Sequence, residues 1–464
     1  MPYVPKPIDE FVMNVEEHQL GVMSEQCEHC SAFKFAGEGK GLCCDNGKVA
    51  LKALSLPDDL VQLCQNRKFR AQARALNQLA AISSMVGAKV DHSVTKHGTP
   101  VYRVNGQPHH QYGDLNPERG KTRKFCQIYY SDGPTQDERR SKLMKKVPKP
   151  FITDVRKLLE KHNPMVQKFV QVWNAKAMDQ RRNLKLVFYH FDNRIYTAPT
   201  ATEVGAVMDA ATATHRWDVV LHAKGTGQRY LVDYRSSLYD TCQYLLIHPR
   251  GEQGWTPSLR RTDGKNLSCL KYYRFHAFTR SDNINSNPLN FMNRLTQQYV
   301  VDQGLKVEKS QLDYYSYKRH KFRVSNVGAL DQAAQDGKDT AGVKLPTSFK
   351  TGPRSNFEHY KDTVHASSKK GGPHFFITMS TNPQWDEIKR ELLPGQTAFD
   401  RPFLVARVFQ LKLEALKKDL VQLKIFGKVV LIVNVVEFQK KGASTRPYHA
   451  QRQRSANNVQ RQTH

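Results

Sequence analysis

The chain has 464 residues, enough for about three domains of ~150 residues each, and its 39% of hydrophobic residues argues against a disordered protein. Lys and Arg number 71 against 43 Asp and Glu, and the formal net charge of +28 makes nucleic acid the first partner to consider. Because the sequence has neither an apolar run of about 18 residues nor the pattern of a signal peptide, we expect a soluble, intracellular protein without a membrane partner or a small-molecule substrate.

Four of the eight cysteines lie close together near the N-terminus, as Cys27-Glu-His-Cys30 and the adjacent pair Cys43-Cys44. Four thiolates can close a tetrahedral Zn²⁺ site, and a CxxC turn supplies two of them. Neighbouring side chains on an extended chain point in opposite directions, so Cys43 and Cys44 are a poorer pair, and His29 is the alternative ligand. The competing interpretation is a loop-rich lobe with buried free thiols. We expect residues 1–55 to form a small Cys-rich lobe with structural zinc.

Residues 56–150 indicate a small basic region with helices and strands. A helical stretch over residues 54–87 carries Arg, Lys and Gln on its outer face, which favours a solvated basic helix. Alternation from Val101 followed by Asn105-Gly106 predicts a strand and a tight turn. We expect polar loop positions at His109 and His110, and a second strand over residues 125–130.

Residues 151–270 are typical of a mixed region of helices and strands. Apolar residues recur at helical spacing from 151 to 173, with a break at Asn163-Pro164. Short β-branched runs over residues 183–240 predict several strands, and the Gly-rich segment 251–255 predicts a closing turn.

A further helix is predicted to begin at Asn287-Pro288, a good N-cap followed by a good first-turn residue. The helix leads to aromatic residues beside a basic cluster, the combination that single-stranded DNA grooves use: Tyr314, Tyr315, Tyr317, Lys318, Arg319 and Lys321. The alternative is a helix–loop junction with ordinary surface charge.

The last folded stretch predicts a strand, a helix and a strand. Residues 374–379 form a short apolar strand, Asp400-Arg401-Pro402 begins an amphipathic helix, and residues 428–438 are β-branched enough to predict a strand buried on both faces. This order describes an α/β sheet with a crossover helix. A site would be built at the polar strand end formed by Thr378, Ser380 and Asn382.

Four ordered blocks within the last 120 residues carry a family resemblance. They are Pro346-Thr-Ser-Phe349, the segment from Phe376 to Trp385, the segment from Asp400 to Phe409, and the segment from Phe426 to Gly442. They resemble the Helitron-like N-terminal domain of rolling-circle transposases, and upstream pieces extend the resemblance to residues 25–442. It implies a domain of the Rep nuclease type over residues 271–442, a nuclear location, and DNA as the partner, either single-stranded or at transposon ends.

The resemblance also implies a chemistry of nicking and strand transfer. In the family, two histidines separated by one residue hold Mg²⁺ or Mn²⁺ beside the scissile phosphate, and a tyrosine attacks to give a 5′-phosphotyrosine. Here the corresponding segment reads His449-Ala450-Gln451, so a degenerate pair, His449 and Gln451, is the candidate metal site. Tyr448 is a weak candidate nucleophile, since we expect it to lie on a flexible arm.

The residues after Gly442 depart from the family, and we expect residues 443–464 to be a basic, disordered tail. The sequence therefore predicts an α+β or α/β multi-domain chain whose C-terminal sheet resembles an incomplete Rep nuclease domain. We expect a truncated, catalytically incomplete DNA-binding part of a Helitron transposase. The alternatives are a non-catalytic, zinc-containing DNA-binding module domesticated from the transposon and a working nickase that uses Tyr448.

Overall fold

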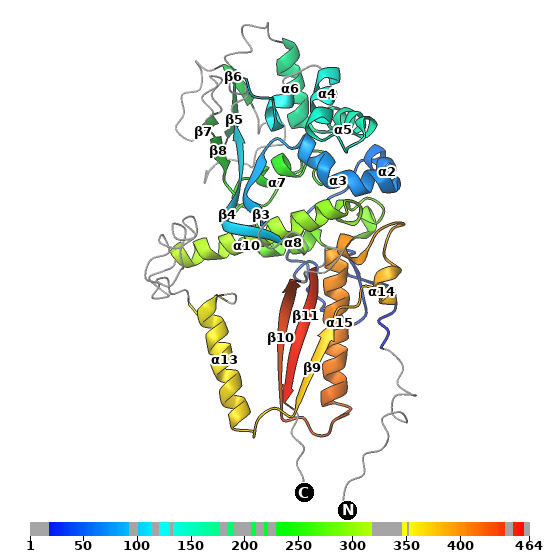
Figure 1. Cartoon of the computed structure of the whole chain (residues 1–464), viewed down its shortest axis with the longest axis vertical. Helices are drawn as coiled ribbons and strands as arrows, with labels where there is room; N and C mark the ends of the chain where they lie inside the picture. Colours follow the sequence, from blue (N-terminus) through cyan, green and yellow to red (C-terminus); the bar gives the residue numbers. More distant parts are fainter. Residues whose placement is uncertain are drawn as a thin grey trace, which may run out of the picture.

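The computed structural model describes residues 18–91, 101–113, 120–129, 133–175, 184–189, 206–209, 218–220, 229–317, 346–349, 352–440 and 449–458. The fold mixes helices with four small sheets and has a Cys-rich cluster near its N-terminus. Figure 1 shows the long helix α10 lying across the middle of the molecule, with helices α4 to α6 above it and the C-terminal sheet, α13 and α15 below it.

The N-terminal elements are a short antiparallel pair and two helices: β1 (Glu25–Gln26), β2 (Phe33–Lys34), α2 (Asp58–Gln65) and α3 (Arg67–Ala80). Helix α3 begins where the side chain of Asn66 accepts a hydrogen bond from the backbone of Lys68. Arg67, Lys68 and Arg74 are exposed as predicted, but Arg70 is buried, and the opposite face buries Phe69 and Leu76 in the main core. The helix ends at Ala80 and not at Gly87 as predicted.

A second sheet has the order β3-β4-β8, with every pair antiparallel: β3 (Ser84–Asp91), β4 (Val101–Gly113) and β8 (Arg229–Val232). The predicted turn at Asn105-Gly106 is wrong, because β4 continues through it. Residues 105–108 instead fall within a register shift, between the pairs Ala88–Val104 and Val86–His109. The strand predicted over residues 125–130 is also wrong, since Phe125–Tyr129 form the 3₁₀ helix η2 and Phe125 has a φ of 51°.

Three helices and a third sheet complete the upper part: α4 (Gly133–Leu143), α5 (Lys149–His162), α6 (Pro164–Ala175), β5 (Leu184–Tyr189), β6 (Ala206–Asp209) and β7 (Asp218–Val220). The sheet has the order β6-β5-β7. The predicted helix break is confirmed: Asn163 ends α5, and its side chain accepts hydrogen bonds from the first turn of α6.

The central helices are α7 (Leu238–Gln243), α8 (Cys269–His276), α9 (Pro288–Phe291) and α10 (Arg294–Tyr317), with the 3₁₀ helix η4 (Ser281–Asn283) between α8 and α9. The N-cap predicted at Asn287 is confirmed by a bond of 3.0 Å from the backbone N–H of Leu289 to its side chain. The apolar positions of the predicted helix, including Met292 and Tyr299, are buried in the main core.

The C-terminal elements are α13 (Pro353–Ser368), β9 (Phe375–Ser380), α14 (Asp386–Lys389), η5 (Ala398–Asp400), α15 (Pro402–Val421), β10 (Leu431–Lys440) and β11 (His449–Asn458). The sheet order is β10-β11-β9. Because β11 is antiparallel to both neighbours, β9 and β10 run parallel to each other, and α15 lies in the crossover between them as predicted. Residues 449–458, expected to lie in a disordered tail, form the central strand.

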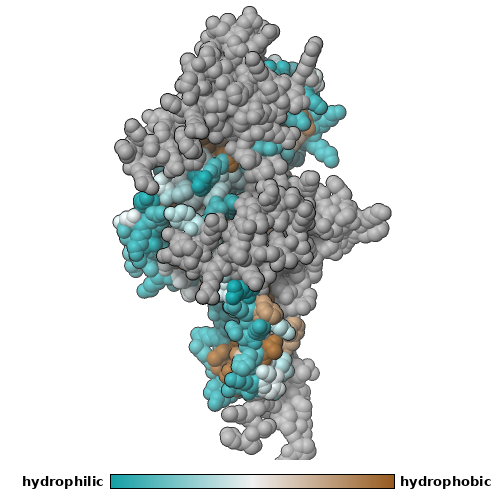
Figure 2. Space-filling view, turned by 90° about the vertical axis from the view of Figure 1, so that its left-hand side faces the viewer, coloured by the Kyte–Doolittle hydropathy of each residue, from teal (hydrophilic) through white to brown (hydrophobic). Residues whose placement is uncertain are grey.

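The lower part of the molecule exposes several apolar side chains. We expected β10 to be buried on both faces, and this is wrong, because Val435 and Val436 are 48% and 44% exposed. Helix α13 also exposes Phe357 and Val364, and Figure 2 shows hydrophobic residues among hydrophilic ones on the side of the molecule that carries α13. Among the described residues, no helix is both long and apolar enough to cross a membrane.

Candidate metal centre

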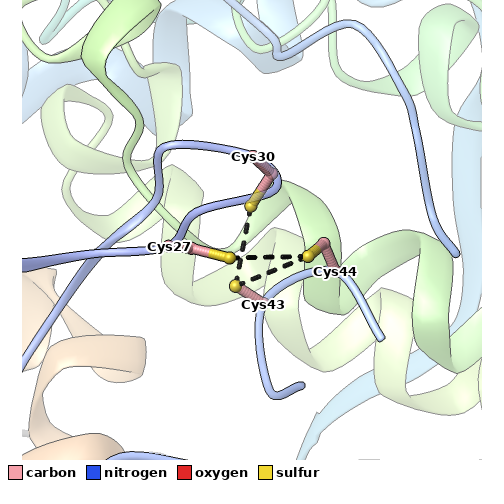
Figure 3. A group of neighbouring side chains, drawn as sticks. All are labelled: Cys27, Cys30, Cys43 and Cys44. Atoms are coloured by element: carbon pink, nitrogen blue, oxygen red, sulfur yellow. Dashed lines mark hydrogen bonds between the residues drawn. The ribbon is translucent and has the colours of Figure 1, made fainter. Parts of the chain in front are cut away.

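The four N-terminal cysteines converge. The Sγ atoms of Cys27, Cys30, Cys43 and Cys44 all lie within 4.8 Å of one another, and Figure 3 shows the side chains pointing toward a common centre. The Sγ–Sγ separations are 3.7 Å for Cys27–Cys44, 3.6 Å for Cys30–Cys43 and 3.9 Å for Cys43–Cys44.

These distances fit a tetrahedral thiolate site. With Zn–S bonds of about 2.3 Å, the sulfur atoms of a regular tetrahedron lie about 3.8 Å apart. The separations found here fall on both sides of that value, and three of the four side chains are buried. The group could therefore hold a metal such as zinc.

Two tight turns bring the ligands together. The first follows β1, where the backbone N–H of Ser31 donates to the carbonyl of Cys27 at 2.8 Å and Ser31 adopts a left-handed φ of 54°. The second turn has Asp45 and Asn46 in the same left-handed region. We expected Cys43 and Cys44 to be a poorer pair, but the chain around them is turned and not extended, so both reach the centre.

The thiols of the cluster differ in their pKa. The hydrogen bond with Cys43 is the main reason that the pKa of Cys30 falls to about 4, and the charge of Arg280 acts in the same direction. That same bond raises the pKa of Cys43, and burial raises the pKa of Cys44 to about 11. The backbone N–H of Gly47 donates to Sγ of Cys44 at 3.2 Å, a contact that stabilises a thiolate ligand.

The alternative ligand, His29, lies outside the group. Its side chain is exposed and packs against Gly47, where an added Cβ would lie 3.1 Å from the ring. The metal group within the described residues consists of the four cysteines alone.

The residues predicted to bind DNA are only partly described. Tyr314 and Tyr317, at the end of α10, are 55% and 77% exposed. Tyr315 packs instead against Phe349, with ring centroids 5.8 Å apart and perpendicular planes. The basic residues predicted beside them lie outside the described residues: Lys318, Arg319 and Lys321.

The backbone of several candidate nicking residues lies at one end of the C-terminal sheet. The pairings Ser380–Arg452 and Lys440–His449 place the ends of β9 and β10 beside the start of β11. Thr378, Ser380 and Asn382 are exposed there. The backbone of His449 and Gln451 belongs to the same end of β11, and Tyr448 lies outside the described residues.

Comparison with known families identifies one segment of the chain. Residues 272–444 match the family described as "Helitron helicase-like domain at N-terminus". The match supports a Helitron-related protein. No curated protein matches the chain. The matched segment runs from α8 through β10, so the cysteine group lies outside it in sequence.

Sequence reasoning missed a buried polar network in the middle of the molecule. His110 of β4 lies 2.8 Å from Asp302 of α10, and both are at most 1% exposed. Lys306 lies one helical turn after Asp302 on α10. It forms a fully buried ion pair with Asp240 of α7, with Nζ 3.4 Å from Oδ1. We had expected His110 to be a polar loop residue. The signal in the sequence was an acidic and a basic residue one turn apart in the predicted helix, Asp302 and Lys306.

Proposed function

We propose that the chain is a DNA-binding region of a Helitron-type rolling-circle transposase. The observation that carries the proposal is the match over residues 272–444 in a chain with a formal net charge of +28. The ancestral role is nicking and transfer of single-stranded DNA through a phosphotyrosine intermediate, and the expected location is the nucleus. The partner is DNA, either single-stranded or at transposon ends.

Zinc is the metal we assign to the cysteine group. An all-thiolate, tetrahedral and largely buried set with no open position is typical of structural zinc sites and not of catalytic ones. Such a site contributes folding free energy, because the ligands converge only in the folded chain.

The DNA surface that we propose includes the end of α10. Tyr314 and Tyr317 offer exposed aromatic faces to bases, and three basic residues follow directly in sequence: Lys318, Arg319 and Lys321. Stacking tolerates every base, and the cations contact phosphates, so this surface suits single strands without sequence preference.

The catalytic role is proposed to be weak or lost. His449 and Gln451 are the residues that would hold Mg²⁺ or Mn²⁺, which would stabilise charge at a phosphate. Gln in place of the second imidazole favours the alternative, a non-catalytic, zinc-containing DNA-binding module. This alternative predicts the same DNA binding without any nicking.

The proposal is tested by binding labelled oligonucleotides at several salt concentrations. We expect the logarithm of the affinity to fall linearly with the logarithm of salt concentration, with a slope of about −0.7 per phosphate contacted on single strands and about −0.9 on duplex. Replacing both Tyr314 and Tyr317 with Ala should weaken single-strand binding by about 1–3 kcal/mol per stacked base.

The matched control is Leu423→Ala, which removes an exposed apolar side chain without an aromatic ring. It should leave the affinity unchanged. Binding that is insensitive to salt, or absent at low salt, would rule out the proposed function.

A further inference from the structure

We propose that the cysteine lobe, residues 18–55, is an internal clamp whose partner is the matched segment and not DNA. In this proposal, the bound metal ion fixes the conformation of the lobe, and the lobe in turn holds α15 against the central helices. The inference rests on the zinc part of the proposed function and goes beyond it, because it assigns the site an architectural role inside the Helitron-like region.

One side of the lobe is joined to the chain beyond α8. The backbone N–H of Phe33 donates to the carbonyl of Thr279 at 2.9 Å, and Ala32 forms a β-bridge with Arg280. The buried guanidinium of Arg280 donates to the carbonyl of Cys43 at 3.4 Å. The matched segment therefore contacts the backbone of one of the four candidate ligand residues directly.

The other side of the lobe is joined to α15. Arg407 makes two hydrogen bonds to the carboxylate of Glu38, at 2.7 and 2.6 Å, and a third to the carbonyl of Phe33 at 3.0 Å. Bidentate pairs of this kind fix orientation as well as adding energy, and here Glu38 is only 3% exposed.

A single face of α15 makes these contacts. Leu404 and Val408 pack with the fully buried Phe35 in a separate small core. Leu411 approaches Gly37, and Lys412 donates to the carbonyl of His18 at 2.7 Å. Positions three, four, seven and eight residues apart share one side of a helix, so this whole stripe of α15 faces the lobe. Figure 1 shows the N-terminal segment passing between α15 and the layer of α8 and α10.

Charge argues against DNA as the partner of the lobe. Residues 18–55 carry four acidic and four basic side chains, so the lobe is neutral within a chain of +28. A Zn²⁺ ion held by four thiolates adds a net charge of about −2, which repels phosphates. The exposed residues beside the first two ligands include Glu25 and Glu28.

The metal and the clamp are linked through a short piece of chain. Phe33, Phe35 and Glu38 follow Cys30 by three, five and eight residues, and Cys43 closes the same loop. When the four sulfurs are held by one ion, both ends of this loop are fixed and its contacts to α15 are pre-organised. Loss of the ion should release the loop and, with it, α15.

The experiment is hydrogen exchange of the full chain by mass spectrometry, with metal content measured on the same samples. Stripping the metal with a chelator should speed exchange in α15 (Pro402–Val421) by about tenfold or more, while α5 keeps its protection. Arg407→Gln should speed exchange in α15 to a similar degree and leave the metal bound, since it breaks the clamp without touching a ligand.

Arg156→Gln is the matched control, because Arg156 also makes a buried carboxylate pair, with Asp137 at 2.9 Å, far from the lobe. It should leave α15 unchanged. If metal is present but neither stripping nor Arg407→Gln alters exchange in α15, the clamp is refuted and the zinc assignment stands. If the folded chain holds no metal, the zinc assignment fails, and the proposed metal lock fails with it.

Discussion

The buried pair of Lys306 and Asp240 offers the sharpest energetic prediction. Both side chains are 0% exposed, with Nζ 3.4 Å from Oδ1, and Tyr273 donates to the other carboxylate oxygen at 2.6 Å. Burial is the largest single influence and raises the pKa of Asp240, but the charge of Lys306 and the smaller contributions of other neighbours, including the hydrogen bond from Tyr273, together outweigh it, and the net shift is downward. The carboxylate is therefore ionised and depends on its partner.

Replacing Lys306 with Met removes the charge and keeps the volume. The substitution leaves Asp240 buried with one hydroxyl donor, so we expect a loss of about 3–5 kcal/mol. Asp240→Asn should destabilise the fold by about 2 kcal/mol less than Lys306→Met does. The ammonium group that it leaves without a carboxylate keeps cation–π contacts, because Nζ of Lys306 lies 4.9 Å from the ring centre of Tyr239 and 5.9 Å from that of Trp255. The double variant should cost less than the sum of the single variants by about 2–3 kcal/mol.

Native-state hydrogen exchange of α10 measures these changes locally, which suits a chain with several folding units. Lys417→Met is the control, since its pair with Glu414 is solvent-exposed and should be worth less than ~0.5 kcal/mol. A loss below about 1 kcal/mol for Lys306→Met, or strict additivity in the double variant, would refute the reasoning.

Two buried histidines, one tightly packed glycine and the candidate nicking residues each give a further prediction. Burial lowers the pKa of His248 to about 4 and that of His276 to about 3, so as the pH falls the unfolded chain binds a proton at each histidine before the folded chain does. The free energy of unfolding should therefore be at its full value above pH 6.5 and fall by about 1.4 kcal/mol per pH unit per histidine toward pH 4. The variant His276→Gln should reduce this slope when unfolding is measured as a function of pH. An unchanged slope would contradict the burial argument. A Cβ added at Gly254 would lie 2.6 Å from the Asp240 carboxylate, so Gly254→Ala should cost about 1–3 kcal/mol in urea unfolding, whereas Gly304→Ala meets nothing within 4 Å and should be neutral or stabilising. Incubation with a single-stranded oligonucleotide and Mn²⁺ should give no covalent adduct; an adduct that disappears in Tyr448→Phe would show a working nickase.

Local signals predicted several helices of this protein, although α4, α8 and α13 were not foreseen and the helical stretch expected over residues 54–87 gives way to β3 at Ser84. The break between α5 and α6 and the start of α9 are marked by Asn-Pro pairs, whose side chains and fixed φ act within one turn. The crossover helix α15 was visible from its apolar spacing alone. These features depend on neighbours in sequence, so the sequence contains what is needed to predict them.

Features that depend on distant residues were not predictable. Asn105-Gly106 is a good turn signal, but pairing of β4 with β3 on both sides of it keeps the strand continuous. The partner of His110 lies 192 residues away, so no local pattern marks it as buried. For the metal centre, sequence spacing predicted the ligands, whereas the left-handed residues Asp45 and Asn46 that let adjacent cysteines converge were not foreseen.

Native mass spectrometry of the full chain, purified with zinc under reducing conditions, tests the central claim most directly. We predict one zinc ion per chain, retained in Cys64→Ala, which changes a buried cysteine outside the group, and lost when Cys27 and Cys30 are both replaced with Ser. A folded chain without metal, or zinc that persists in the double Ser variant, would contradict the account.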